Sequence, residues 1–267
     1  MPHNPHFCSR MYDFSVGDSG FAISFSEPAP PHDPPADTET VRIGAFNVQV
    51  FGETRAAKPE AMEVLARIVR TYDIVAVQEI RDGSGTALPA LIDAVNAEGS
   101  RYACLEGPRL GRTSSKEQYV YLYDTRTTEP AGSAITYPEP DGFDPFHREP
   151  CIMPFRVTNG TFDAVLIVIH TDPDEATEET DALTNMVPIA GTTYRAEEDF
   201  IIMGDLNADG SCFDEDGAST LRHEDSMWLI GKRPRHHYKS HRVHLRQDRH
   251  NRRRHSRLFR GCGRFPV

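Results

Sequence analysis

The chain has 267 residues, a formal net charge of -11 and 38% apolar residues, so it can form one large domain or two small ones around a hydrophobic core. No window approaches the roughly 18 apolar residues of a membrane span, and we expect no membrane partner. Residues 1–40 lack a basic start followed by an apolar run, so we expect no secretory signal; the compartment is unknown, cytoplasmic by default. The five cysteines are scattered without a CxxC pair, which argues against a zinc site and a disulfide framework.

The charge is divided unevenly along the chain. Residues 232–267 contain 13 of the 29 Lys and Arg residues but a single acidic residue, Asp248, so the rest of the chain carries 16 basic and 39 acidic side chains. We therefore distinguish a strongly acidic body from a basic tail at residues 231–267, which we expect to be disordered.

In chain order, the sequence begins with a segment rich in proline and then alternates strand and helix patterns. Residues 1–40 have five prolines clustered at 28–35 and no sustained periodicity, so we expect a mobile arm. The predicted strands are residues 41–50, 73–80, 119–123, 151–157, 162–169 and 200–203, and the predicted helices are residues 58–70, 88–96 and 175–186. Strands that alternate with helices predict a layered α/β domain with a site along one rim.

Polar side chains interrupt or directly follow several of these apolar runs. They are Asn47, Glu79, His170, Asp205 and Asn207. Taken singly, each has an ordinary structural explanation: a solvated carboxylate at a strand end, an Asx-rich turn after residue 204, or a structural histidine. Taken together, they would form an acidic cluster with one titratable base at a rim of the domain. Carboxylate and amide oxygens fit Mg²⁺, with Ca²⁺ or Mn²⁺ as alternatives, and such a cation would bring an anionic phosphodiester close to the carboxylates.

Seven short motifs occur in a fixed order across residues 41–230. They are Ile-Gly-Ala-Phe-Asn at 43–47, Phe-Gly-Glu-Thr at 51–54, Tyr-Asp-Ile-Val at 72–75 with Gln-Glu-Ile-Arg-Asp at 78–82, Leu-Gly-Arg at 110–112 with Lys-Glu at 116–117, Arg-Glu-Pro at 148–150, Ile-His at 169–170 and Met-Gly-Asp-Leu-Asn-Ala-Asp at 203–209. Each motif alone is weak, but the ordered set is specific. It resembles the endonuclease/exonuclease/phosphatase superfamily, and within it the deoxyribonuclease I-like enzymes.

The resemblance implies a fold and an activity. The fold would be a four-layer α/β sandwich, with two packed mixed β-sheets flanked by helices, formed by residues 41–230. The activity would be that of a metal-dependent endonuclease that hydrolyses DNA phosphodiester bonds. DNA would be the partner, and no stable protein partner is expected.

The resemblance also implies roles for individual residues. The metal ligands would be Asn47, Glu79 and Asp205. The catalytic residues would be Glu79, Glu117, His170, Asp205 and Asn207. Within this set, His170 would be a general acid/base, and Glu117 would hold its imidazole in place. This pairing raises the pKa of the histidine and fixes its tautomer. The residues that contact DNA would be Arg81 at the minor groove and, at the phosphates, Arg112, Arg148 and Asn207.

The chain departs from the family pattern at two positions and at its end. Ser115 and Gln49 stand where close relatives carry a Tyr and an Arg, which predicts a weaker grip on DNA. After residue 230 the family segments Thr-Thr, Cys-x-Tyr-Asp-Arg and Ser-Asp-His are absent. The resemblance implies that a second catalytic histidine is lost with them. The cysteine that pairs with the position of Cys212 in relatives is lost too, so Cys212 would be a free thiol. The C-terminal part of the fold would then be missing.

We hypothesise that the sequence from about residue 231 is a frameshifted reading. Codons exist for residues 235–251 that, read one nucleotide later, spell a run containing Cys-Thr-Tyr-Asp-Arg where the family has that segment. Sequencing the source gene tests this hypothesis, and an in-frame gene without the hidden motif would reject it.

Two alternatives to an active endonuclease remain open. Another phosphodiesterase or a phosphatase of the same superfamily would use the same metal side, although Arg81 and the segment 112–117 favour DNA. A catalytically inactive relative would bind nucleic acid through the basic tail, with an affinity that falls steeply with salt and persists without Mg²⁺.

Overall fold

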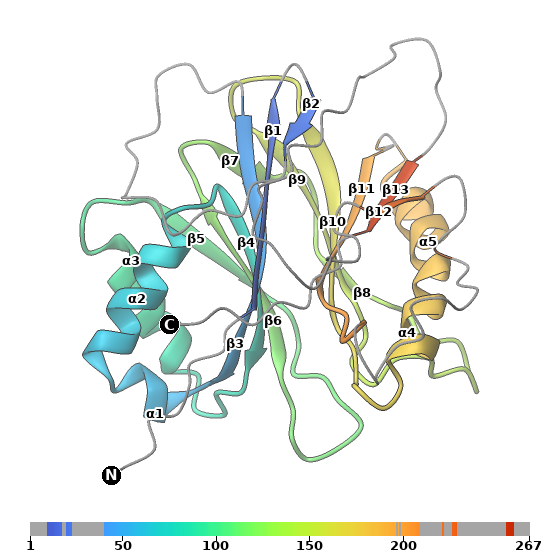
Figure 1. Ribbon diagram of the computed structural model, residues 1–267, viewed down its shortest axis with the longest axis horizontal. Helices are drawn as coiled ribbons and strands as arrows, with labels where there is room; N and C mark the ends of the chain where they lie inside the picture. Colours follow the sequence, from blue (N-terminus) through green and yellow to red (C-terminus); the bar gives the residue numbers. More distant parts are fainter. Residues whose placement is uncertain are drawn as a thin grey trace, which may run out of the picture.

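Two β-sheets packed face to face form the centre of the molecule, with helices on both outer faces (Figure 1). The computed structural model describes residues 10–17, 20–22, 40–195, 197, 199–208, 221, 226–228 and 255–258. Both sheets contain parallel and antiparallel pairs and are therefore mixed. This arrangement confirms the four-layer α/β sandwich that the motifs predict.

The first sheet has six strands within the described residues, in the order β2-β1-β3-β4-β6-β5. Its central pair, β3 and β4, is parallel, and the pairs on either side are antiparallel. The strands are β1 (Arg10–Gly17), β2 (Gly20–Ala22), β3 (Thr40–Phe51), β4 (Ile74–Ile80), β5 (Tyr102–Glu106) and β6 (Gln118–Asp124).

The second sheet has the described order β12-β13-β11-β10-β9-β7, with β8 beside β9. Its strands β10 and β11 are parallel, so their carboxyl ends lie at the same edge of the sheet. The strands are β7 (Thr128–Pro130), β8 (Ile135–Thr136), β9 (Cys151–Val157), β10 (Asp163–His170), β11 (Asp199–Asp205), β12 (Ser226–Trp228) and β13 (His255–Leu258).

Helices cover the outer face of each sheet. In α2, a proline stands at the first helical position, and residues spaced near one helical turn, such as Met62, Leu65 and Val69, are buried against the first sheet. The helices are α1 (Glu53–Ala56), α2 (Pro59–Val69) and α3 (Ala87–Asn96) on the first sheet, and α4 (Ala176–Ala182), the 3₁₀ turn η1 (Leu183–Asn185) and α5 (Met186–Thr193) on the second.

The alternation of side chains along the strands builds three separate apolar interfaces. In β10, Leu166 and Val168 face the first sheet, whereas Val165 and Ile167 face the helices on the opposite side. All four side chains are fully buried. A strand buried on both faces reads as a continuous apolar run, which is why residues 162–169 show no polar alternation.

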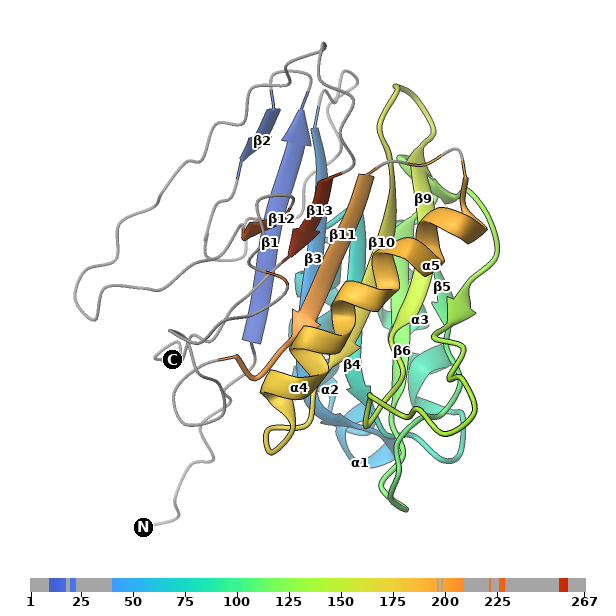
Figure 2. The same ribbon diagram turned by 90° about the vertical axis from the view of Figure 1, so that its right-hand side faces the viewer.

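The first and last segments differ from the sequence expectation. Residues 10–17 and 20–22 are not part of a mobile arm but form β1 and β2, with β1 paired along β3 (Figure 2). In the tail, residues 255–258 form β13, which pairs in parallel with β11. The edges of β3 and β11 offer unpaired backbone N–H and C=O groups, and pairing satisfies them without any requirement for apolar periodicity.

Several predictions lie outside the described residues. These are the proline cluster at 28–35, the thiol of Cys212 and the lost C-terminal half-site between residues 229 and 254. Within the described residues, Cys104 and Cys151 are free thiols. No helix in the described part of the chain combines the length and the apolar character needed to cross a membrane.

Candidate active site

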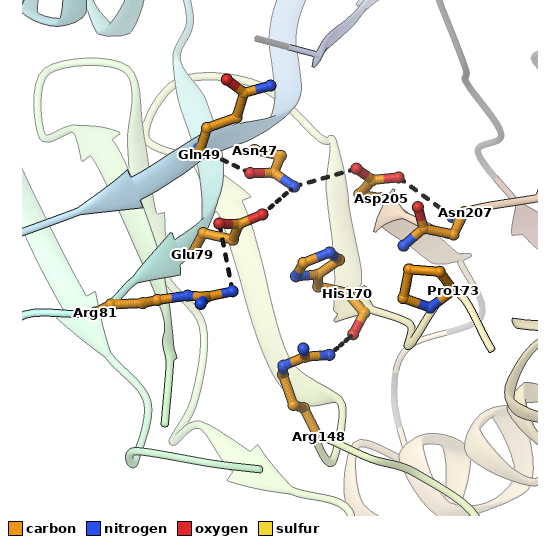
Figure 3. A pocket seen from close by; sticks show the side chains of 9 residues that line it. All are labelled: Asn47, Gln49, Glu79, Arg81, Arg148, His170, Pro173, Asp205 and Asn207. Atoms are coloured by element: carbon orange, nitrogen blue, oxygen red, sulfur yellow. Dashed lines mark hydrogen bonds and ion pairs between the residues drawn. The ribbon is translucent and has the colours of Figure 1, made fainter. Parts of the chain in front are cut away.

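A pocket of about 300 Å³ opens where the two sheets meet at the ends of β4, β10 and β11 (Figure 3). The register of the parallel strands places His170 opposite Asp205, and Asn47 opposite the residue before Glu79. Nine residues line the pocket: Asn47, Gln49, Glu79, Arg81, Arg148, His170, Pro173, Asp205 and Asn207. Seven of them are residues to which the resemblance gives a site role, and they come from strands and loops far apart along the chain.

The Asn47 amide joins the two sheets at the centre of the pocket. Its Nδ2 donates to Oε1 of Glu79 over 2.9 Å and to Oδ2 of Asp205 over 3.1 Å. Its Oδ1 accepts the backbone N–H of Gln49 over 2.9 Å. One buried amide therefore holds two carboxylates, one from each sheet, close to each other.

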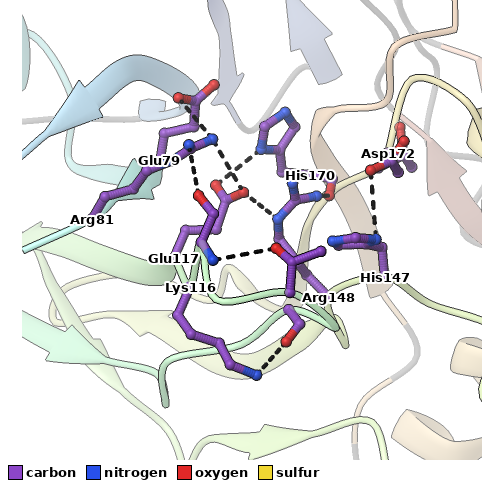
Figure 4. Close-up of polar contacts among 12 residues, drawn as sticks. Glu79, Arg81, Lys116, Glu117, His147, Arg148, His170 and Asp172 are labelled. Atoms are coloured by element: carbon purple, nitrogen blue, oxygen red, sulfur yellow. Dashed lines mark hydrogen bonds and ion pairs between the residues drawn. The ribbon is translucent and has the colours of Figure 1, made fainter.

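His170 lies beside a buried carboxylate. Its Nδ1 is 3.0 Å from Oε2 of Glu117, whose side chain is 1% exposed (Figure 4). Arg148 forms an ion pair with Glu117 and donates from Nη1 to the His170 carbonyl oxygen over 3.0 Å. With Glu117 ionised, its oxygen accepts the Nδ1 proton, so the neutral imidazole has its basic lone pair on Nε2.

The charge state of Glu117 follows from its surroundings. Burial raises its pKa, but the hydrogen bond and charge of His170 and the charges of Arg148 and Arg81 outweigh burial, and the pKa lies below its usual value. Glu117 is thus an anion at neutral pH and keeps the imidazole in one tautomer. This geometry agrees with the pairing that the resemblance implies.

Tyr119 contacts the backbone of His170, and the sequence did not indicate this contact. Its hydroxyl oxygen accepts the backbone N–H of His170 over 2.8 Å, and the ring is buried between the sheets. Burial raises the pKa of this phenol well above its usual value, so it stays neutral. The signal in the sequence is the run of alternating tyrosines at 119–123, which reads as a strand and gives no reason to single out its first hydroxyl.

Asn207 lies just after the end of β11 in a left-handed backbone conformation, with φ of 43°. Its backbone N–H donates to Oδ1 of Asp205 over 3.2 Å, and its Nδ2 donates to the carbonyl oxygen of Thr171 over 2.9 Å. The second bond ties the segment after β11 to the segment after β10. The side chain lines the pocket next to Asp205.

The predicted arginines are placed differently from one another. Arg81 lines the pocket with Nη2 3.5 Å from Oε2 of Glu79, and its Nη1 donates to Oγ of Ser115 over 3.0 Å. Arg148 also lines the pocket, but its side chain is only 9% exposed. Arg112 is not a lining residue, and its ion pairs are with Asp144 (3.0 Å) and Glu175 (2.6 Å). A phosphate contact by Arg112 would compete with both.

The donor set of the pocket fits a hard divalent cation. Glu79 and Asp205 offer carboxylate oxygens on either side of Asn47. Among the described residues there is no group of three or more His, Cys, Asp or Glu side chains around one metal position. Magnesium is commonly bound through one or two carboxylates, with water and substrate phosphates completing its shell, so a pair of carboxylates is sufficient for this ion.

The fold is a four-layer α/β sandwich, in which helices flank two mixed sheets. At the rim that the two sheets share, it has an acidic site with two neighbouring carboxylates and a histidine that a third carboxylate holds. The chain belongs to the Endonuclease/Exonuclease/phosphatase family, whose model matches residues 44–263.

The chain is similar to deoxyribonucleases of animals. Deoxyribonuclease-1-like 2 of Mus musculus is 36% identical over 171 residues, which are 63% of this chain and 60% of that protein. Deoxyribonuclease gamma of Homo sapiens is 33% identical over 199 residues, 72% of this chain and 65% of that protein. The chain thus spans 60 to 65% of the length of these two relatives. A crystal structure of an endonuclease/exonuclease/phosphatase family protein from Bacteroides thetaiotaomicron has a TM-score of 0.47 at 16% identity, covering 70% of this chain and 72% of that chain.

Proposed function

We propose that the protein is a metal-dependent endonuclease that hydrolyses phosphodiester bonds in DNA. The observation that carries the proposal is the Asn47 amide, which holds Glu79 and Asp205 together in a pocket that His170 also lines. An anionic phosphodiester is repelled by two carboxylates unless a divalent cation is bound between them. The names of the relatives, deoxyribonuclease-1-like 2 and deoxyribonuclease gamma, support DNA as the substrate.

In this proposal Glu79 and Asp205 hold the cation, and Asn47 keeps their side chains in place. The bound cation would neutralise charge on the phosphate oxygens and polarise the phosphorus for attack. His170 accepts a proton at Nε2 from the attacking water, because Glu117 keeps Nδ1 protonated and stabilises the imidazolium that forms. Arg81 and Arg148 carry the positive charge of the pocket lining and would contact the phosphate.

Among the described residues, His170 is the one histidine that lines the pocket, so the leaving oxygen would take its proton from water. A relative with a second general acid also protonates the leaving oxygen, and loss of one general acid/base costs about 10² to 10⁴ in rate. We therefore propose that this chain cleaves DNA more slowly than relatives that contain both histidines.

A plasmid-nicking assay tests the function. Supercoiled DNA is incubated with the full chain in Mg²⁺ and in a chelator, and the unmodified chain is compared with Glu79→Ala and His170→Ala. We expect nicking in Mg²⁺, none in chelator, and a rate at least about 10²-fold lower in each variant. Glu129→Ala, at an exposed ion pair in β7, serves as the matched control and keeps the unmodified rate.

The same assay separates the two alternatives. A phosphatase of the same fold would release phosphate from p-nitrophenyl phosphate while leaving the plasmid intact. A non-catalytic binder would retard DNA in chelator, and its affinity would fall steeply as salt is added. Nicking that is unaffected by Glu79→Ala and His170→Ala would reject the proposed site.

A further inference from the structure

The backbone next to the pocket is strained in an unusual way. Within the described residues, four residues other than glycine have positive φ: Gln49 at 51°, Val50 at 61°, Glu79 at 63° and Asn207 at 43°. Three of them line the pocket, and the fourth, Val50, is hydrogen-bonded to one of the three. Strained backbone persists only where the surroundings hold it in place, and it gathers at functional sites.

Val50 is the least expected member of this group. A β-branched residue is a genuine outlier in the left-handed region, and no packing explains the choice because the Val50 side chain is 53% exposed. Its backbone N–H, however, donates to Oε2 of Glu79 over 2.9 Å. The preceding N–H, that of Gln49, donates to Oδ1 of Asn47 over 2.9 Å. Two successive amides thus point at the two side chains that face each other in the pocket.

The strand pairing explains how the turn reaches Glu79. Between the paired positions Asn47↔Gln78 and Phe51↔Ile80, β3 has three residues where β4 has only Glu79. The extra residues form a turn at 48–50 that folds over the carboxylate. β4 is irregular at the same place in its pairing with β6. The two strands are therefore bulged against each other at the proposed metal ligand, as bulges often are next to active sites.

Contacts on both sides hold the turn in place. The carbonyl oxygen of Val48 accepts a hydrogen bond from the guanidinium of Arg55 at the first helix after β3. The carbonyl oxygen of Phe51 accepts the backbone N–H of Arg81 over 2.8 Å. Phe51 itself is fully buried. The turn is therefore anchored to the sheet on both sides, although Val50 itself is exposed.

We propose that the left-handed turn at Gln49 and Val50 positions the metal ligands, with the Val50 N–H fixing the carboxylate of Glu79 and the Gln49 N–H fixing the amide of Asn47. The inference rests on the proposed function, since it concerns the same cation site. Asn47 donates to Oε1 of Glu79 and Val50 donates to Oε2, while Nη2 of Arg81 lies 3.5 Å from Oε2. A carboxylate oxygen can accept more than one partner, so both oxygens can still contact a cation. The role belongs to the backbone, so the identity of the Val50 side chain is secondary to it.

An amide-to-ester replacement at Val50 tests the proposal. It removes one N–H donor and leaves the side chain in place. The same replacement at Val64, an exposed valine in α2, is the matched control because it removes a backbone N–H far from the pocket. The readout is the affinity of the full chain for Mn²⁺ alone, measured without DNA by the loss of the free-ion electron paramagnetic resonance signal.

We expect the ester at Val50 to weaken Mn²⁺ binding by about tenfold or more, because it removes a group that orients a metal ligand. The ester at Val64 should change the affinity for Mn²⁺ by less than about twofold. Val50→Gly, which keeps the N–H and accepts positive φ, should bind Mn²⁺ more tightly than the Val50 ester. Equal affinity for the unmodified chain and the Val50 ester would overturn the inference, as would a Val50→Gly affinity no better than that of the ester. A chain that binds no Mn²⁺ also overturns it, whereas a chain that binds Mn²⁺ without nicking DNA rejects only the proposed function.

Discussion

At the scale of single residues, Glu117 is the carboxylate on which one imidazole and two guanidinium groups converge. His170 and Arg148 contact it directly, and Arg81 lies 3.8 Å away. Removing its charge leaves Arg148 buried without an anionic partner, which costs about 3 to 5 kcal/mol. We expect Glu117→Gln to lower the free energy of unfolding by about that amount at neutral pH, measured by urea denaturation.

The pH dependence gives a second readout of the same change. Because the Glu117 pKa is lowered in the folded chain, its stabilising contribution is present above the usual value of 4.5 and is lost as the pH falls through the folded pKa. The difference between the unmodified chain and Glu117→Gln should therefore shrink in acid. Glu129→Gln, at an exposed pair with Arg156, should change stability by less than about 1 kcal/mol at either pH. If the difference in unfolding free energy between the unmodified chain and Glu117→Gln does not change with pH, the ionised Glu117 carboxylate is not the source of the stability.

Glu179 in α4 should show the opposite pH dependence. Its carboxyl group is fully buried, and it accepts the backbone N–H of Asp172 over 3.0 Å. Burial raises its pKa from 4.5 to about 7. Stability from the protonated form is therefore present below the usual pKa and lost as the pH rises through about 7.

We expect Glu179→Gln to be about as stable as the unmodified chain in mild acid and more stable by roughly 2 to 4 kcal/mol above neutral pH. The exposed neighbour Glu178 provides the control, since Glu178→Gln should give no such pH-dependent difference. Denaturant melts across the pH range measure both. A Glu179→Gln variant that loses stability as the pH rises, in parallel with the unmodified chain, would show that the carboxyl group is not the source.

At the scale of elements, β11 depends on a glycine just before Asp205. Gly204 has φ of 135°, and a Cβ at this position would lie 1.8 Å from the carbonyl oxygen of Ile169 in β10. The close approach of β10 and β11 is what sets His170 opposite Asp205. Any side chain at 204 must push the two strands apart.

Gly204→Ala is therefore expected to lower the free energy of unfolding by more than about 3 kcal/mol, because backbone strain and a clash with main chain coincide. Gly83→Ala is the control, since nothing lies within 4 Å of a Cβ there, and it should stay within about 0.5 kcal/mol. A Gly204→Ala chain as stable as the control would contradict a close approach of β10 and β11 at this position.

The sequence predicts elements whose apolar pattern is long and continuous. Residues 151–157 coincide with β9, and the patterns at 58–70 and 88–96 correspond to α2 and α3. Short strands such as β7 and β8 were missed because two or three residues carry no period. The helix predicted at 175–186 is divided into α4 and η1, and α5 continues from Met186 to Thr193, where Pro188 obscured the helical pattern.

The strand ends predict which residues belong to the candidate site, but they do not predict the contacts between these residues. Asn47, Glu79, His170 and Asp205 stand out because each interrupts or ends an apolar run. Their mutual contacts depend on how two sheets pack, and periodicity along one strand does not specify that. Arg112 illustrates the difference. A sequence motif identifies this residue, but its ion-pair partners, Asp144 and Glu175, lie in other segments that the motif does not include.

At the scale of the whole molecule, a cation bound at Glu79 and Asp205 would join the two sheets. A ligand that binds only the folded chain stabilises it by about 2.7 kcal/mol at one hundred times its dissociation constant. For a chain of this size we expect saturating Mg²⁺ to raise the melting temperature by about 5 to 10 °C. Calorimetry of the unmodified chain and of Glu79→Ala measures this, and an equal rise in both would exclude Glu79 as a ligand.

The central claim is that a cation held by Glu79 and Asp205 contacts the phosphate that is cleaved. Its most direct test is the cleavage of duplex DNA made with phosphorothioates in place of phosphates, because sulfur binds Mg²⁺ poorly and the softer Mn²⁺ better. We predict that the sulfur substitution slows cleavage strongly in Mg²⁺ and that Mn²⁺ restores the rate toward that of normal DNA. An equal loss of rate in both metals, or cleavage that continues in chelator, would contradict the claim.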